Sequence, residues 1–413
     1  MELAIYAHPW DLRALQQGGG LRRLGDLGFG EVALAVSYHA GRWFTPWQPD
    51  SMVRFLEDGT VHYRPQADYG RLAPLASSEV RDGEPSPLEW LCEHAPAAGL
   101  RARAWAVLTH NTRLGELHPD CCVENAFGDR YSYSLCPAQP AVQRYAAAMV
   151  EDLRRHPGLS AIELEAVAPL GHRHNSHHDK SSWAPETFAD ALLSTCWCDA
   201  CRRGLAAMEF EGAAVGAARV ATLRAAFAAA LRRRYTDGDC MGPAEPKLDR
   251  QGLLDRLRAE FGADVAGIPA NRMLGILQLL VPLQSKTPGA ARLCAQTNYD
   301  GLRDGAALPL AMVAGSVEEA ALTVYGQDPR AVAAALPHLL AARGEALTPP
   351  LPRAQWPALR LCFHPKAPQF TGDDDLRALR ALCTEHGVGA ISIYHLGLLP
   401  WRTIERVAKV MAS

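Results

Sequence analysis

The sequence has no excess of charge of either sign, which narrows the partners it can bind. Its 42 lysines and arginines nearly balance 45 aspartates and glutamates, giving a formal net charge of −3 at pH 7. A basic surface of the kind that binds nucleic acid is therefore not indicated. Hydrophobic residues make up 48% of the chain and charged residues 21%, so disorder is not indicated either. We expect no nucleic-acid partner.

Long apolar runs and a targeting signal are also missing. No stretch approaches the roughly 18 uninterrupted apolar residues of a membrane span. The first residues, MELAIYAHPWDLRAL, lack the basic region, apolar run and cleavage site of a secretory signal. We expect a cytoplasmic protein without a membrane partner. Its 11 cysteines are an odd set for disulfides, and a reducing compartment leaves thiols free to bind metal or to pack.

Short apolar or β-branched runs alternate with helical patterns along the chain. Eight such runs predict strands at 3–9, 31–39, 101–110, 160–169, 291–299, 321–329, 358–365 and 390–400. Alanine, leucine and arginine recur at helical spacing in the segments 141–156, 216–235, 328–344 and 400–411. Eight strand–helix units predict one closed (β/α)8 TIM barrel over residues 1–413, an α/β fold.

Two connections are too long for ordinary strand-to-helix loops. They are insertions at about 40–85, after the second strand, and about 166–290, after the fourth. Both belong on the catalytic face of a barrel. An open nucleotide-binding sheet would instead need a glycine-rich turn after its first strand, and the GGG at 18–20 sits inside a helical pattern. We therefore expect no nucleotide cofactor.

Polar side chains gather where the predicted strands end, which is where (β/α)8 barrels carry their chemistry. One histidine at a strand end is more often structural than catalytic, but histidines at five strand ends predict a polar pocket. The candidate substrate-binding residues at strand ends are His8, His39, His110, Asn111, Gln296, Asn298, Tyr325, His364, Lys366 and Tyr394.

The fourth predicted strand carries two acids in phase. Side chains alternate along a strand, so Glu163 and Glu165 share one face and Ile162 and Leu164 the other, apolar face. Both acids should point into the barrel, where a carboxylate needs a cationic partner or a raised pKa. A structural salt bridge with Arg103 is the alternative, and it fits Glu163 better than Glu165.

The heptapeptide TCWCDAC (195–201) places three cysteines at C-x-C-x-x-C spacing. Thiolates at this spacing can face one tetrahedral zinc ion if a fourth ligand comes from elsewhere. That ligand could be Cys136, Cys121, Cys122 or a histidine of GHRHNSHHDK (171–180). Packed, reduced cysteines are the alternative.

One segment resembles the family 42 glycoside hydrolases, the β-galactosidase type. It runs from HPD (118–120) through GDRYSYSLCPAQP (128–140) and IELE (162–165) to CWCDAC (196–201), about a fifth of the chain. The resemblance implies a (β/α)8 barrel, Glu165 as the acid/base, and a structural zinc. The zinc ligands that it implies are Cys136, Cys196, Cys198 and Cys201.

The chain departs from that family at two places. Leu164 stands where the family has Asn, and the seventh strand reads RLCFHPKAP, without the family's nucleophilic glutamate. Asp328, Glu163 or the loop residue Asp179 would then have to partner Glu165, or the substrate would provide its own nucleophile, positioned by Tyr325 or His364.

The histidine-rich loop 171–180 follows the Glu165 strand and should cover the pocket. Its histidines could hold a catalytic metal, but substrate contacts, with Asp179 and Lys180 included, are the better interpretation. In the first insertion Trp43, Phe44 and Trp47 could stack on sugar rings or form a hydrophobic lid.

Three functions fit these features. The first is a glycoside hydrolase acting on a small sugar conjugate, and the second is a lyase, epimerase or isomerase on the same barrel, possibly metal-assisted. The third is a carbohydrate-binding barrel without catalysis, which would leave two inward glutamates unexplained. A homo-oligomer is compatible with all three.

Overall fold

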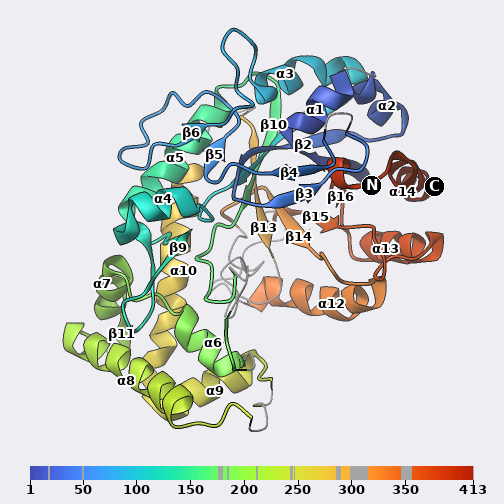
Figure 1. The fold of residues 1–413 in the computed structure, drawn as a ribbon. Coiled ribbons are helices and arrows are strands. Elements are labelled where there is room, and N and C mark those ends of the chain that lie inside the picture. Colours follow the sequence, from blue (N-terminus) through green and yellow to red (C-terminus); the bar gives the residue numbers. More distant parts are fainter. Residues whose placement is uncertain are drawn as a thin grey trace.

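The structure is a computed structural model that describes residues 1–16, 19–48, 51–174, 180–183, 186–210, 213–241, 245, 247–284, 290–297, 315–345 and 356–412. Eight parallel strands pair side by side in chain order, and the first pairs with both the second and the last, so the ring is closed (Figure 1). They are β1 (Glu2–Ala7), β2 (Glu31–Tyr38), β7 (Arg101–Val107), β10 (Leu159–Glu165), β13 (Arg292–Thr297), β14 (Glu319–Thr323), β15 (Ala358–Phe363) and β16 (Ala390–Ile393). The predicted (β/α)8 barrel and its eight strands are confirmed.

Helices surround the ring and bury an apolar stripe against it. They are α1 (Pro9–Gln16), α2 (Gly20–Asp26), α3 (Pro87–His94), α5 (Pro140–Arg154), α12 (Pro329–Glu345), α13 (Asp373–Glu385) and α14 (Trp401–Ala412). In α14 the buried Ile404, Val407, Ala408 and Met411 recur at helical spacing, which explains why this segment forms an amphipathic helix on the barrel.

Two glycines of the triplet mark the start of a second helix. Gly19 has φ +64°, a left-handed conformation that glycine adopts at little cost, and it is the N-cap of α2, which begins at Gly20, whereas α1 ends at Gln16.

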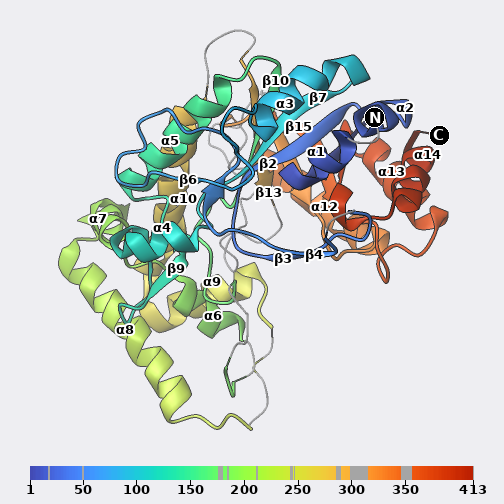
Figure 2. The same ribbon diagram turned by 45° about the horizontal axis from the view of Figure 1, so that its top comes forward.

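The first insertion contains two short pairs of strands. β3 (Arg42–Phe44) and β4 (Val53–Phe55) form a hairpin, and β5 (Thr60–Val61) extends the sheet beyond β2 and pairs with β6 (Leu75–Ala76). Figure 2 shows the β3–β4 hairpin on the other side of β2 from α3.

The second insertion builds a helical lobe beside the barrel (Figure 1). Its elements are α6 (Thr187–Ser194), α7 (Asp199–Ala207), β11 (Glu209–Phe210), β12 (Ala213–Ala214), α8 (Ala217–Thr236), α9 (Arg250–Phe261) and α10 (Gly267–Leu280). An apolar cluster of its own, with Trp197, Phe227 and Phe261 at its centre, holds these helices together.

A third excursion, between β7 and α5, was not predicted. It comprises α4 (Thr112–Leu117), β8 (Cys122–Glu124) and β9 (Arg130–Leu135), with β8 and β9 paired as a hairpin. The alternation in RYSYSL and the Asn125–Gly128 turn were the available signals. This hairpin delivers Cys136 to the second insertion.

One helical stretch, Ala263–Leu283, is long and apolar enough to cross a membrane by length and composition, with a mean hydropathy of 1.3. Within it, Ile276, Leu279 and Leu280 are buried in the core that α5 shares, and α10 contacts both α5 and α7. One third of this window is buried inside the structure.

Candidate active site

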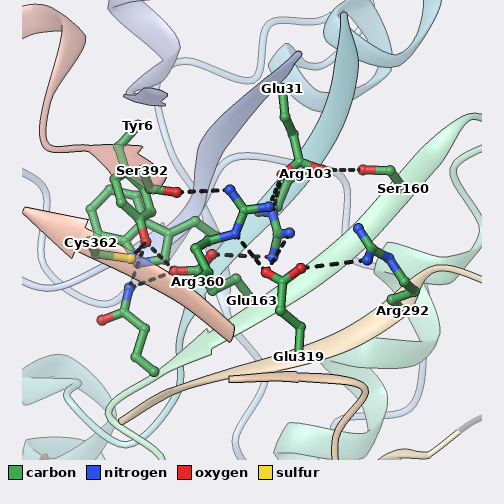
Figure 3. Close-up of polar contacts among 12 residues, drawn as sticks. Tyr6, Glu31, Arg103, Ser160, Glu163, Arg292, Glu319, Arg360, Cys362 and Ser392 are labelled. Atoms are coloured by element: carbon green, nitrogen blue, oxygen red, sulfur yellow. Dashed lines mark hydrogen bonds and ion pairs between the residues drawn. The ribbon is translucent and has the colours of Figure 1, made fainter. Parts of the chain in front are cut away.

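Two arginines and three glutamates form a buried ionic network inside the barrel (Figure 3). Arg103 donates hydrogen bonds to Glu31 (2.7 Å), Glu319 (2.8 Å) and Glu163 (3.3 Å). Arg360 donates to Glu319 (2.6 Å) and Glu31 (2.8 Å). Each arginine bridges carboxylates from different strands, so the network fastens the ring together near the start of β2 and β14.

The network holds Glu31 and Glu319 in the charged form. Burial alone would raise the pKa of Glu319, but the charges of Arg103 and Arg360 outweigh it and lower that pKa to about 2. The same two arginines overcome burial at Glu31 and lower its pKa as well. These carboxylates are therefore structural ion-pair partners near neutral pH.

Glu163 belongs to this network. It is fully buried, and besides Arg103 it accepts hydrogen bonds from the Tyr6 hydroxyl and from the Gln296 amide, the latter at 2.8 Å (Figure 3). Its oxygens are thus engaged by protein groups, as is the amide of Gln296. This placement favours the structural alternative, a salt bridge with Arg103, over a catalytic role for Glu163.

Glu165 lies one step nearer the C-terminal end of β10 and has a different environment. Its Oε2 accepts a 2.6 Å hydrogen bond from the indole Nε1 of Trp105 on the neighbouring strand β7. Burial raises the pKa of Glu165 to about 7; the Trp105 hydrogen bond opposes the shift and the charge of Glu163 adds to it. A carboxyl group with this pKa can donate a proton near neutral pH.

Aromatic rings surround the Glu165 carboxyl group. The hydroxyls of Tyr38 and Tyr394 lie 3.3 Å apart, and the ring of Tyr325 lies 4.7 Å from that of Tyr394. Each of these tyrosines is close enough to Glu165 for the carboxylate charge to raise its pKa, in addition to the larger effect of burial. Tyr325 is 38% exposed, so the group opens to solvent on its side. Such a wall can pack against a sugar ring and hydrogen-bond its hydroxyls.

His8 lies beneath this aromatic wall and is fully buried. Its ring stacks on Trp10 at 4.5 Å and meets Trp43 edge-on at 4.5 Å. Burial lowers its pKa well below the usual value, so the imidazole is neutral. Trp43 therefore packs inside the site, whereas Phe44 is 57% exposed, and Trp47 donates a hydrogen bond to the Leu396 carbonyl.

Three histidines from three segments meet on the rim. His39 stacks on His110 with ring centroids 4.0 Å apart, and the ring of His174 stands edge-on to His110 at 4.8 Å. Burial lowers the pKa of His110 to about 2 and lowers that of His39. Neutral stacked imidazoles offer hydrogen bonds and flat surfaces to a ligand. His174 comes from the histidine-rich loop, whose residues 175–179 lie outside the described part of the chain.

Other predicted residues have structural partners or lie apart from Glu165. The Asp328 carboxylate accepts a 2.8 Å hydrogen bond from the amide of Ala331 in the first turn of α12, as a helix cap does. Asn111 caps α4 in the same way, through Leu114 at 2.9 Å.

The remaining predicted residues lie at the periphery. His364 is half-buried with its ring 5.7 Å from Tyr394, and with the exposed Lys366 it lines a groove of about 1110 Å³ between α13 and α14. Lys180 is exposed. Asp179 and Asn298 lie outside the described residues.

Four cysteine thiols converge beside the helical lobe. Cys136, after β9, meets Cys196 and Cys198 from the α6–α7 connection and Cys201 from the first turn of α7, with all four Sγ atoms within 4.8 Å of one another. The Sγ of Cys136 lies 3.5 Å from that of Cys201 and 3.8 Å from that of Cys196.

These separations suit a metal better than a disulfide. A disulfide needs sulfurs about 2.05 Å apart. Thiolates around a tetrahedral zinc with Zn–S bonds of about 2.3 Å are about 3.8 Å apart. Of the alternatives for the fourth ligand, the structure brings Cys136 into the cluster. Within the described ranges, this is the one group of three or more histidine, cysteine and acidic side chains whose ligand atoms converge.

Some residues of the site were not singled out from the sequence. Trp105 is the most informative, because it holds Glu165 and lies in phase with Arg103 on β7. The alternation that oriented Glu163 and Glu165 would have placed Trp105 inside the barrel too. The contact of Tyr6 with Glu163 joins β1 to β10, which are far apart in sequence, so the spacing of residues could not reveal it.

These features define a (β/α)8 barrel with an acid-bearing cluster of aromatic side chains at the C-terminal ends of its strands. The fold resembles β-galactosidase from the psychrophilic Marinomonas ef1, with a TM-score of 0.53 and 11% identity over all of this chain and 59% of the other. The catalytic domain of β-amylase from Paenibacillus polymyxa has a TM-score of 0.52 and 10% identity over all of this chain and 98% of the other.

A second β-galactosidase, from Bacillus circulans sp. alkalophilus, has a TM-score of 0.53 and 11% identity, and the match covers 55% of its length. The chain thus spans a little over half the length of these β-galactosidases. No family model matches the sequence, and no curated protein matches it. The likeness therefore concerns the fold, which the (β/α)8 glycoside hydrolases share.

Proposed function

We propose that the protein is a glycoside hydrolase that acts on a small sugar conjugate, with Glu165 as its general acid. The observation that carries this proposal is the environment of Glu165. Its pKa of about 7 keeps a share of this carboxyl group protonated near neutral pH, and the 2.6 Å hydrogen bond from Trp105 holds the group in one orientation at the end of a barrel strand. The tyrosines around it suit a sugar ring.

In this reaction Glu165 donates its proton to the glycosidic oxygen as the bond to the anomeric carbon breaks. Of the three acids predicted as its partner, Glu163 is engaged by Arg103, Asp328 caps a helix, and Asp179 lies outside the described residues. We infer that the substrate supplies the attack on the anomeric carbon, for example by a 2-acetamido group, with the Tyr325 hydroxyl available to position it.

A panel of nitrophenyl glycosides, with and without a 2-acetamido group, tests the proposal. We expect release of nitrophenol from at least one acetamido sugar, and the variant Glu165→Gln should lower kcat/KM by roughly 10²–10⁴-fold. Variant Glu385→Gln, at an exposed position at the end of α13, serves as the matched control and should keep its activity. Activity that survives in Glu165→Gln would exclude Glu165 as the acid.

The rim histidines favour a second candidate, a lyase, epimerase or isomerase on a sugar-like substrate. His39 stacks on His110 and is neutral, so it could accept a proton next to a carbonyl group, whereas a pKa of about 2 makes His110 a poor base. Such an enzyme would leave every glycoside in the panel intact and would exchange a substrate C–H proton with deuterated water.

We also propose that Cys136, Cys196, Cys198 and Cys201 bind a structural zinc ion. Four protein ligands would close the coordination shell, so the ion would stabilise the fold and leave the chemistry to the barrel. It would fasten the third excursion to the helical lobe, since Cys136 comes from one and the other three cysteines from the other.

A further inference from the structure

A groove runs alongside the aromatic side chains that surround Glu165. It is lined mainly by the β3–β4 hairpin, the loop between β15 and α13, and α14, and its volume is about 1110 Å³ with the open mouth included. The ring of His364, in its wall, lies 5.7 Å from that of Tyr394. Phe44, also in its wall, directly follows Trp43, whose ring lies 6.0 Å from the same tyrosine. A substrate that packs against Tyr394 can therefore extend into this groove.

Most of the lining of the groove is apolar. Phe370, Leu376, Leu399 and Val407 contribute to it and are buried. Phe44 contributes an aromatic ring that is 57% exposed, so its surface is available to a ligand. Apolar and aromatic side chains that line a concave surface are typical of a site for a small molecule with an apolar part.

Few polar groups of the groove are left for a ligand. The Arg406 guanidinium donates a hydrogen bond to Asp373, and the Thr371 hydroxyl donates one to Asp375 at 2.9 Å. Burial lowers the pKa of His364 to about 4, so its ring is neutral near pH 7. A sugar ring carries several hydroxyl groups and needs several hydrogen-bonding partners, so the groove suits an apolar substituent of a sugar better than another sugar.

Lys366 gives the groove a positive charge. Its side chain is exposed and has no ion-pair partner in the described part of the chain. None of the described residues that line the groove carries a carboxylate, and Asp373 and Asp374, at the start of α13, are each paired with an arginine. The Lys366 ammonium also lies close enough to His364 to lower its pKa further. An anionic group in the groove therefore meets a cation without meeting an acid of the lining.

We propose that this groove binds the leaving group of the substrate, and that the leaving group is an aromatic aglycone that carries a carboxylate. The aromatic ring packs against Phe44, and the carboxylate pairs with Lys366. This inference rests on the hydrolase function proposed above and names the class of glycoside that the enzyme cleaves. His364 lies between the two parts of the substrate, since it borders both the groove and Tyr394.

Isothermal titration calorimetry tests the groove without any bond cleavage. The probes are 4-hydroxyphenylacetate, a phenol that carries a carboxylate, and 4-hydroxyphenylacetamide, a neutral amide of nearly the same shape. We expect the carboxylate to bind with a roughly millimolar dissociation constant and the amide roughly fivefold more weakly, as is typical of one ion pair near solvent.

Variants of the wall locate the bound probe. Lys366→Met removes the charge and keeps an apolar side chain, so it should bind the carboxylate and the amide equally. Phe44→Ala removes the aromatic surface and should weaken both probes roughly fivefold. Lys247→Met is the matched control, at an exposed lysine of the second insertion, and should leave both dissociation constants within about twofold of wild type.

Kinetics provide the second readout. The substrates are the glycosides of the same two phenols, made with the sugar that the nitrophenyl panel identifies. In wild type the KM of the carboxylate glycoside should be roughly fivefold below that of the amide glycoside, and in Lys366→Met the two KM values should be equal.

The inference is overturned if the amide binds wild type as tightly as the carboxylate does, or if the preference for the carboxylate persists in Lys366→Met. Equal KM values for the two glycosides in wild type would exclude the groove as the leaving-group site. Inactivity toward every glycoside, with binding of the carboxylate still dependent on Lys366, would instead overturn the hydrolase proposal and leave the groove as a site for aromatic carboxylates. The two failures are therefore distinguishable.

Discussion

Glu163 and Glu165 lie two residues apart on β10 and face the same barrel interior, yet their carboxylates have different kinds of partner. Glu163 accepts from the Arg103 guanidinium, whose positive charge it shares with Glu31 and Glu319. Glu165 accepts from a neutral indole N–H, so burial still raises its pKa. The same strand therefore carries an ion-pair residue, Glu163, and, nearer its C-terminal end, a proton donor, Glu165. The two carboxyl groups differ in role because charged groups surround the first and neutral groups the second.

The first prediction concerns the pH dependence of hydrolysis. A general acid must be protonated, so kcat/KM should be high below the pKa of Glu165 and fall as pH rises through about 7. The Trp105 hydrogen bond stabilises the charged form of Glu165, so the variant Trp105→Phe should raise this pKa and move the basic limb to higher pH. Steady-state kinetics of wild type and Trp105→Phe across the neutral range measure the basic limb of each enzyme.

The variants Trp105→Phe and Glu165→Gln separate proton donation by Glu165 from positioning of the substrate by Trp105. If Trp105 acted only by packing against the substrate, its loss would lower kcat/KM at every pH and leave the limb in place. An unmoved limb in Trp105→Phe would therefore contradict the coupling of Trp105 to Glu165. Glu165→Gln should abolish the limb.

The second prediction tests Asp328, which the sequence suggested as a catalytic acid. Its carboxylate caps α12 through Ala331, and asparagine caps helices about as well as aspartate does. Asp328→Asn should thus keep kcat/KM within about threefold of wild type, a change of less than 1 kcal/mol in the barrier. If Asp328→Asn is as inactive as Glu165→Gln, Asp328 takes part in the reaction and the capping interpretation is insufficient.

The third prediction concerns the ionic network. Arg360 is fully buried and bridges Glu31 to Glu319, so Arg360→Met leaves buried carboxylates with too little positive charge. The free energy of unfolding, measured by urea denaturation at pH 7, should fall by about 3–5 kcal/mol.

Arg292→Met is the matched control for that variant. Arg292 also approaches Glu319, at 3.5 Å, but its side chain is 43% exposed. Its loss should cost about 1 kcal/mol or less. If Arg360→Met and Arg292→Met lower the free energy of unfolding equally, the buried ion pairs stabilise the fold no more than an exposed one does.

The sequence predicted the ring of strands and the orientation of the β10 acids because both follow from local periodicity. Alternation of apolar and polar residues over seven positions needs no knowledge of distant contacts. The roles of Asp328 and Asn111 could not be read in this way. Both stand at strand ends, but the helix that follows takes each carboxyl or amide oxygen as a cap.

The different roles of Glu163 and Glu165 likewise could not be predicted from the sequence. It depends on Tyr6, Arg103 and Gln296 meeting Glu163 from three other strands, and such long-range pairing leaves no mark on spacing. The second insertion shows the same limit. Its helices could be recognised, but not the apolar cluster that they share.

The last prediction concerns the cysteine cluster. Purified protein should contain close to one zinc per chain by elemental analysis, because the four thiols converge with separations that suit one tetrahedral ion. Cys198→Ser removes one ligand, so it should lower the zinc content and the melting temperature together. Cys240→Ser, at an exposed free cysteine outside the cluster, should change neither.

A wild-type protein that is fully folded and free of metal, with Cys198→Ser as stable as Cys240→Ser, would show that the four thiols only pack together. Chelation of wild type should reproduce the loss of stability in Cys198→Ser, since ligand removal and ion removal break the same link between the third excursion and the helical lobe.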